Sequence, residues 1–107
     1  MPERITKPTL RLLEVMLTDP SRDWYGLELM DFASLRSGTV YPILHRLETD
    51  GWLTSAREEV DPVDAGRPRR RLYRLTATGE AAARALLSRP GTERLTVGPL
   101  LPEGAMR

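Results

Sequence analysis

Two clusters of side chains in this sequence have the chemistry to bind a polyanion such as nucleic acid. Small residues let the backbone approach a phosphate, and hydroxyl, imidazole and guanidinium groups hydrogen-bond to phosphates or base edges. The first cluster combines these residue types: Ser37, Gly38, Thr39, Tyr41, Pro42, His45 and Arg46. The second cluster consists of guanidinium groups, which can pair with phosphate through two parallel hydrogen bonds: Arg67, Arg69, Arg70 and Arg71.

Other kinds of chemistry lack the residues they need. His45 is the only histidine and there is no cysteine, so a transition-metal site would lack partner ligands. The acidic set around the second cluster lacks the glycine and glutamate positions of a calcium loop: Glu58, Glu59, Asp61 and Asp64. No nucleophile elbow, P-loop or dinucleotide fingerprint occurs in the chain. We therefore expect no enzymatic activity, no cofactor and no bound metal.

Composition indicates one folded domain with an uneven charge distribution. The chain has 107 residues, 40% of them hydrophobic, and a net charge of only +1. Residues 1–60 carry seven basic and ten acidic side chains (net −3), whereas residues 61–107 carry nine and five (net +4). The absence of cysteine fits a reducing compartment, and no apolar run approaches the ~18 residues of a membrane span. Without an apolar leader at residues 1–8, we expect a cytoplasmic protein.

Hydrophobic periodicity predicts three helices in the first half. The first covers residues 10–17 with Thr9 as its N-cap, and Asp19-Pro20 ends the run. The second spans residues 25–33 and should turn Tyr25, Leu29 and Phe32 toward the core. The third begins between residues 37 and 39, because Pro42 has to lie in its first turns, and it ends near residue 50.

The third helix has two clearly different faces. One arc is apolar and should be buried: Val40, Ile43, Leu44 and Leu47. The opposite face holds the first cluster of candidate binding residues instead of the Glu/Lys pairs typical of a merely solvated helix. The alternative, a polar face that only contacts water, remains open from this helix alone.

A hairpin and a last helix follow. Strands are predicted at residues 53–59 and 69–75, separated by a mobile loop, and Thr76 should cap a helix over residues 77–88. This order describes a mainly α (α+β) winged helix-turn-helix with three helices, a two-stranded wing and one C-terminal helix. We expect this domain to cover residues 1–89 and residues 90–107 to form an irregular tail. Trp24 and Trp52, at element ends, are expected in the core or a dimer contact.

The predicted wing concentrates positive charge. Strand alternation places Tyr73 and Leu75 on one face, where they should pack on the third helix. Arg67 lies between Gly66 and Pro68 at the expected loop tip, where it could enter a narrow minor groove. The alternative is a basic edge strand that prevents aggregation, and both roles can hold together.

Several segments resemble one family of regulators. The recognition helix of PadR-like transcriptional regulators is similar to the segment SGTVYPILHRLE at residues 37–48 with GWL at 51–53. Further similarity lies in YGLEL at residues 25–29 and in GRPRRRLYRLTATG at residues 66–79. The resemblance covers about residues 9–89. It identifies the chain as a short member, because the last predicted helix ends at Pro90 without a full C-terminal helical domain.

The resemblance implies a cytoplasmic bacterial homodimer that binds a pseudo-palindromic operator, usually as a repressor. It maps the DNA-facing start of the recognition helix to five residues: Ser37, Gly38, Thr39, Tyr41 and Pro42. It maps the wing to Arg67, Arg69 and Arg70. The family dimerises mainly through helices after the wing, so here the first helix and residues 90–107 are candidate substitutes. A small-molecule effector fits the family, but no residue identifies one.

We therefore expect a sequence-specific regulator whose partner is double-stranded DNA. Tyr41→Ala and Arg46→Ala should weaken operator binding, whereas Arg70→Ala should weaken binding to all sequences and flatten its salt dependence. The alternative is a winged-helix module that binds protein and modulates another regulator. Salt separates the two, because a protein partner requires no steep salt dependence.

Overall fold

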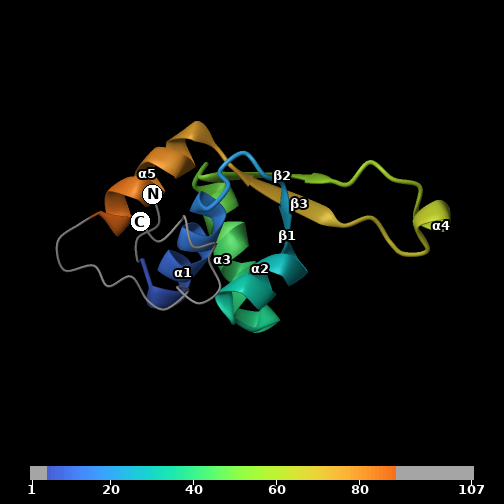
Figure 1. The fold of residues 1–107 in the computed structure, drawn as a ribbon, viewed down its shortest axis with the longest axis horizontal. Helices are drawn as coiled ribbons and strands as arrows, with labels where there is room; N and C mark the ends of the chain where they lie inside the picture. Colours follow the sequence, from blue (N-terminus) through green and yellow to red (C-terminus); the bar gives the residue numbers. More distant parts are fainter. Residues whose placement is uncertain (1–4, 89–107) are drawn as a thin grey trace.

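Five helices and a three-stranded antiparallel sheet form residues 5–88, the part of the chain that the computed structural model describes (Figure 1). The elements in chain order are α1 (Lys7–Leu17), β1 (Trp24–Tyr25), α2 (Gly26–Ala33), α3 (Ser37–Thr49), β2 (Leu53–Arg57), α4 (Pro62–Ala65), β3 (Arg71–Leu75) and α5 (Ala77–Leu87). The predicted α+β class and its order of three helices, a hairpin and a last helix are confirmed. The predicted tail lies outside the described residues.

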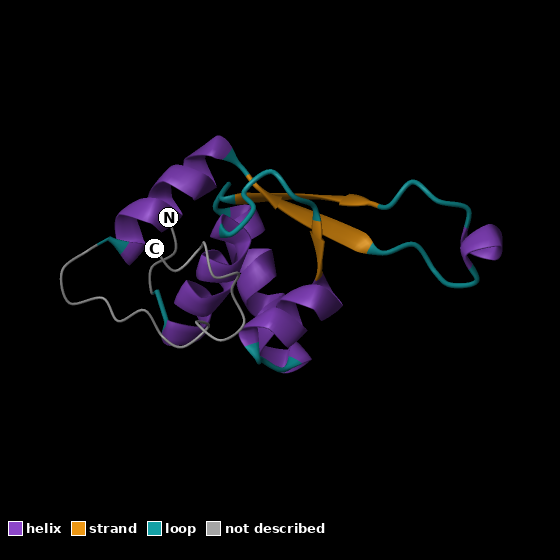
Figure 2. Cartoon of the chain, viewed as in Figure 1, coloured by secondary structure: helices purple, strands orange, loops and turns teal. Residues whose placement is uncertain are grey.

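The helices pack into one core beside the sheet (Figure 2). The buried arc of α3 is the predicted one, since Val40, Leu44 and Leu47 are fully buried and Ile43 is 7% exposed. Leu12, Leu13 and Met16 of α1 are likewise fully buried. Burial of each such aliphatic side chain stabilises the fold by about 1.5–3 kcal/mol, so this packing holds α3 in one rotation about its axis.

Two details of the helices differ from the prediction. The N-cap of α1 is Thr6, whose hydroxyl accepts from the Thr9 backbone N–H, and Thr9 itself is buried inside the helix. The prediction started the helix after Pro8, but proline is compatible with the first helical turn, and α1 includes Pro8. Phe32 is not a core residue: its ring packs edge-on against Trp24 but stays 37% exposed. Helical periodicity therefore predicted the core-facing side of α2 only approximately.

The sheet contains a strand that sequence patterns did not predict. β1 pairs with β3, with Trp24 opposite Tyr73, which makes the strand order β1-β3-β2. Two residues are too short for an alternation signal. The wing strands are also shorter than predicted, ending at the Arg57–Arg71 pair. Glu58 N–H still donates to the Arg70 carbonyl (2.8 Å), and beyond this bond the two arms separate around α4 (Figure 1).

The last described helix, α5, closes the fold. Its N-cap is Thr76, as predicted, and the Thr76 hydroxyl accepts from Gly79 N–H at 2.9 Å. α5 packs on α1 and β3, and Ala83, Leu86 and Leu87 are buried. Within residues 5–88, no helix has the length and apolar character that crossing a membrane requires.

Candidate nucleic-acid interface

The first cluster of candidate residues lies on the outward face of α3. Six of its members are exposed: Ser37, Gly38, Tyr41, Pro42, His45 and Arg46. Thr39 is half-buried. The turn at residues 34–36 sets this helix against α2, and Ser34 there adopts a left-handed conformation (φ 56°). The arrangement leaves one polar face of a helix, free of carboxylates from residue 37 to residue 47, exposed to solvent.

Within this cluster, Tyr41 is positioned by a contact with a neighbouring element, α2. Its side chain is 43% exposed and lies against the start of α2. A Cβ placed on Gly26 would be 2.3 Å from the Tyr41 hydroxyl oxygen, so only glycine leaves room for this ring. Sequence reasoning missed Gly26 as part of the interface. The signal in the sequence was the glycine that follows Tyr25 at the start of a helix. Nothing in the local sequence requires a glycine there, which indicates a close neighbour from another element.

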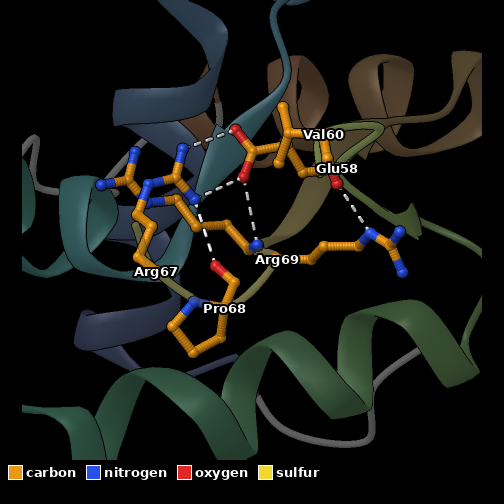
Figure 3. Close-up of polar contacts among 6 residues, drawn as sticks. Glu58, Val60, Arg67, Pro68 and Arg69 are labelled. Carbon is orange, nitrogen blue, oxygen red and sulfur yellow. Dashed lines mark hydrogen bonds and ion pairs between the residues drawn. The ribbon is translucent and has the colours of Figure 1, made fainter. Parts of the chain in front are cut away.

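In the wing, the structure places Arg67 differently from the prediction (Figure 3). Its guanidinium donates to both carboxylate oxygens of Glu58, from Nη1 to Oε1 at 2.7 Å and from Nη2 to Oε2 at 3.1 Å. Glu58 also accepts from Arg70 N–H at 3.2 Å. The expectation that Arg67 forms the loop tip is therefore wrong. Its partner Glu58 lies on the opposite arm of the hairpin, and the sequence does not show that the fold brings the two side chains together.

The actual tip of the wing is the single helical turn α4. Asp61 caps it, its side chain accepting from Val63 N–H at 2.9 Å, and Gly66 ends it at φ 70°. Val63 is 85% exposed, and Glu59, Asp61 and Asp64 lie near it in the sequence, with no basic residue from 59 to 66. Phosphates would repel this acidic tip. The positive charge of the wing lies instead in its neck, which contains residues 67–70, and at the base of β3, where Arg71 begins the strand.

The other three wing arginines lie at successive points along this neck. Arg69 Nε donates to the Val60 carbonyl at 2.9 Å, which ties the two arms together (Figure 3). The Arg70 guanidinium stacks on the Tyr25 ring, 4.2 Å from its centroid, and Arg71 is exposed. Tyr73 and Leu75 are buried on the sheet face toward the helices, as alternation predicted. Arg70 and Arg71 thus approach Tyr41, whereas Arg67 and Arg69 do not.

Glu58 gives the wing neck a measurable pH dependence. The hydrogen bonds from Arg67 and from the Arg70 backbone lower the pKa of Glu58 from its usual 4.5 to about 2. Because the pKa is lower in the folded chain, the stabilisation from ionised Glu58 is present above pH 4.5 and is lost as the pH falls through about 2. Carboxyl-carbon NMR titration should give a Glu58 midpoint near 2, and a midpoint near 4.5 would contradict this ion pair.

A match to known proteins covers most of the described fold. A model of the transcriptional regulator PadR-like family matches residues 12–85. Transcriptional regulator Rv3488 of Mycobacterium tuberculosis is 56% identical over 45 residues. That alignment covers 42% of this chain and 37% of the relative, so the chain matches little more than a third of its length.

Solved structures are similar over a longer stretch. The PcaV transcriptional regulator from Streptomyces coelicolor, solved with its natural ligand, has a TM-score of 0.61 and 26% identity, covering 77% of this chain and 52% of that one. A PadR-like transcription factor of Bacteroides fragilis has a TM-score of 0.57 and 27% identity, covering 75% and 79%. The neighbours are winged-helix regulators, which agrees with the element order described above.

Proposed function

We propose, from the premise that this chain belongs to the transcriptional regulator PadR-like family, that it binds operator DNA with α3 in a major groove. Members of this family are transcriptional regulators and not enzymes. In the proposed complex, the outward face of α3 contacts base edges and the base of β3 contacts the DNA backbone. The protein acts in the cytoplasm, where its operator is accessible.

One observation supports this proposal above the others. The apolar arc of α3 is buried in the core, and six candidate residues on its opposite face are exposed, of which Tyr41 packs against Gly26. That face contains hydroxyl, imidazole and guanidinium groups, which are donors and acceptors suited to base edges and phosphates. Serine and glycine at its start allow a close approach of the backbone.

We further propose a homodimer that represses transcription by occupying a pseudo-palindromic operator. Two copies of α3 would lie about 34 Å apart, in successive major grooves on one side of the duplex. Residues 5–88 bury their own small core, and a partner subunit would add stability to a domain of this size. A small-molecule effector is part of this proposal, since the neighbour PcaV was solved with its natural ligand.

The test is a mobility shift with DNA from upstream of the protein's own gene, because regulators of this kind often repress themselves. Binding is measured at two salt concentrations with unrelated competitor DNA present. We expect a discrete shift that survives competition and weakens with salt, because phosphate contacts release counterions. A footprint of the shifted complex should then show two related half-sites.

Two other outcomes would contradict parts of the proposal. A diffuse band that disappears with added salt or competitor DNA would indicate nonspecific electrostatic binding and no operator in this fragment. No binding at low salt would favour the alternative function, a winged-helix module that binds another protein. Sedimentation of the complex separates one bound copy from two and so tests the dimer independently.

A further inference from the structure

We propose that a hollow between α2, α3 and β3 holds one phosphate of the DNA backbone, an inference that rests on the proposed function and adds a specific contact to it. The hollow has a volume of about 130 Å³. Its lining includes Tyr25, Gly26, Tyr41, Arg70, Arg71 and Tyr73. We call it the phosphate hollow. Leu27 also lines it, so three segments that are distant in sequence meet at one small depression that combines aromatic and aliphatic surface with two guanidinium groups.

Charge is the first argument for an anion. Arg70 and Arg71 both line the hollow, and neither forms an ion pair with a carboxylate in the described part of the chain. The nearby carboxylate of Glu28 at the start of α2 is already neutralised, because it pairs with Arg22 and accepts from Tyr25 N–H. The charge of Arg70 also acts on Glu58 in the wing, whereas no carboxylate within residues 5–88 forms an ion pair with Arg71, so the hollow attracts an anion.

Arg70 is also held in position. The Arg70 guanidinium lies over the Tyr25 ring at 4.2 Å, which restricts the rotamers of a long side chain before any ligand arrives. Tyr73, two residues from Arg71 on the same strand, also lines the hollow, and its phenol is a hydrogen-bond donor at neutral pH. Pre-positioned donors lose less conformational entropy on binding than flexible ones do.

Gly26 and Tyr41 connect the hollow to the recognition helix. Tyr41 belongs to the outward face of α3, and its hydroxyl oxygen lies where a Gly26 side chain would have to be, 2.3 Å from an ideal Cβ. The ring is thus held at the rim between the helix and the arginines. A phosphate at the edge of the major groove can contact the hydroxyl of Tyr41 and a guanidinium together, which sets the depth of α3 in the groove.

The experiment compares Arg71→Gln with Arg57→Gln on a 20-base-pair duplex of unrelated sequence over a range of salt. Arg57 is the matched control, because it pairs with Arg71 across the hairpin, is also exposed and does not line the hollow. We expect Arg71→Gln to weaken binding about tenfold and to lower the salt slope by about 1. Arg57→Gln should leave both nearly unchanged.

A second pair of variants tests the link to Tyr41. Gly26→Ala should displace the Tyr41 ring and weaken binding to all sequences, and Tyr41→Phe should weaken it through loss of the hydroxyl alone. In a Tyr41→Ala background, Gly26→Ala should have little further effect, since the three atoms nearest to a Cβ at that position all belong to Tyr41. Circular dichroism confirms that each variant is folded.

The outcomes separate this inference from the proposed function. Equal losses for Arg71→Gln and Arg57→Gln would mean that only the general positive field matters, and the phosphate hollow would be overturned while DNA binding stands. An additive effect of Gly26→Ala in the Tyr41→Ala background would overturn the positioning of Tyr41. A wild-type chain that binds no duplex at low salt would overturn both the hollow and the proposed function.

Discussion

Gly79→Ala is expected to lower the free energy of unfolding by up to about 2 kcal/mol. Gly79 lies in the first turn of α5, where an ideal Cβ would be 2.0 Å from the Trp52 carbonyl oxygen and 2.7 Å from its carbon. These are backbone atoms and cannot rotate away. The same carbonyl accepts from Thr76 N–H at 3.0 Å, so a shift of α5 would also disturb the helix cap. Overpacking costs about 1–3 kcal/mol and sometimes more, and the helix preference of alanine returns about 1 kcal/mol.

Urea unfolding monitored by tryptophan fluorescence measures this effect, because Trp52 reports on the contact itself. Gly38→Ala is the matched control, since no atom lies within 4 Å of a Cβ at that position and the residue is exposed in α3. We expect Gly38→Ala to leave stability unchanged or to raise it by up to about 1 kcal/mol. Equal stability of the two variants would show that α5 does not approach Trp52 as closely as described.

Arg46→Ala is expected to lower operator affinity about ten- to a hundredfold, the range of about 1–3 kcal/mol for a lost base contact. Arg46 is exposed on α3, and none of the ion pairs within residues 5–88 involves it. Its guanidinium is therefore free to contact a guanine or a phosphate. If it contacts a guanine, affinity for the operator should fall much more than affinity for unrelated DNA, and discrimination between guanine and other bases should relax at one position.

Arg84→Ala controls for the loss of one positive charge at a distance from this helix. Arg84 is exposed on α5 and pairs with Glu80 at 2.9 Å, an ion pair of little energetic weight. We expect this variant to bind operator and unrelated duplexes as the wild type does, in the same titrations. If Arg46→Ala weakened both duplexes equally, Arg46 would be a backbone contact and base recognition would have to come from the other exposed residues of α3.

Much of the fold follows from local patterns. The apolar arc of α3 was predictable because a helix repeats every 3.6 residues, so Val40, Leu44 and Leu47 had to share a face. That constraint also determined which residues of α3 are exposed, and so most of the candidate interface. Thr76 was predictable as a cap, because its hydroxyl serves a backbone N–H only three residues away.

Contacts between distant segments decided the rest. The pairing of β1 with β3, the ion pair between Arg67 and Glu58 and the fit of Tyr41 over Gly26 each join residues that no periodic pattern relates. Phe32 shows the same limit, since periodicity predicts a face but not whether another element covers it. By itself the sequence determined which helix is presented and that arginines accompany it. Only the tertiary structure decided which arginines approach that helix, because ion pairs and close packing across elements depend on where the chain returns in space.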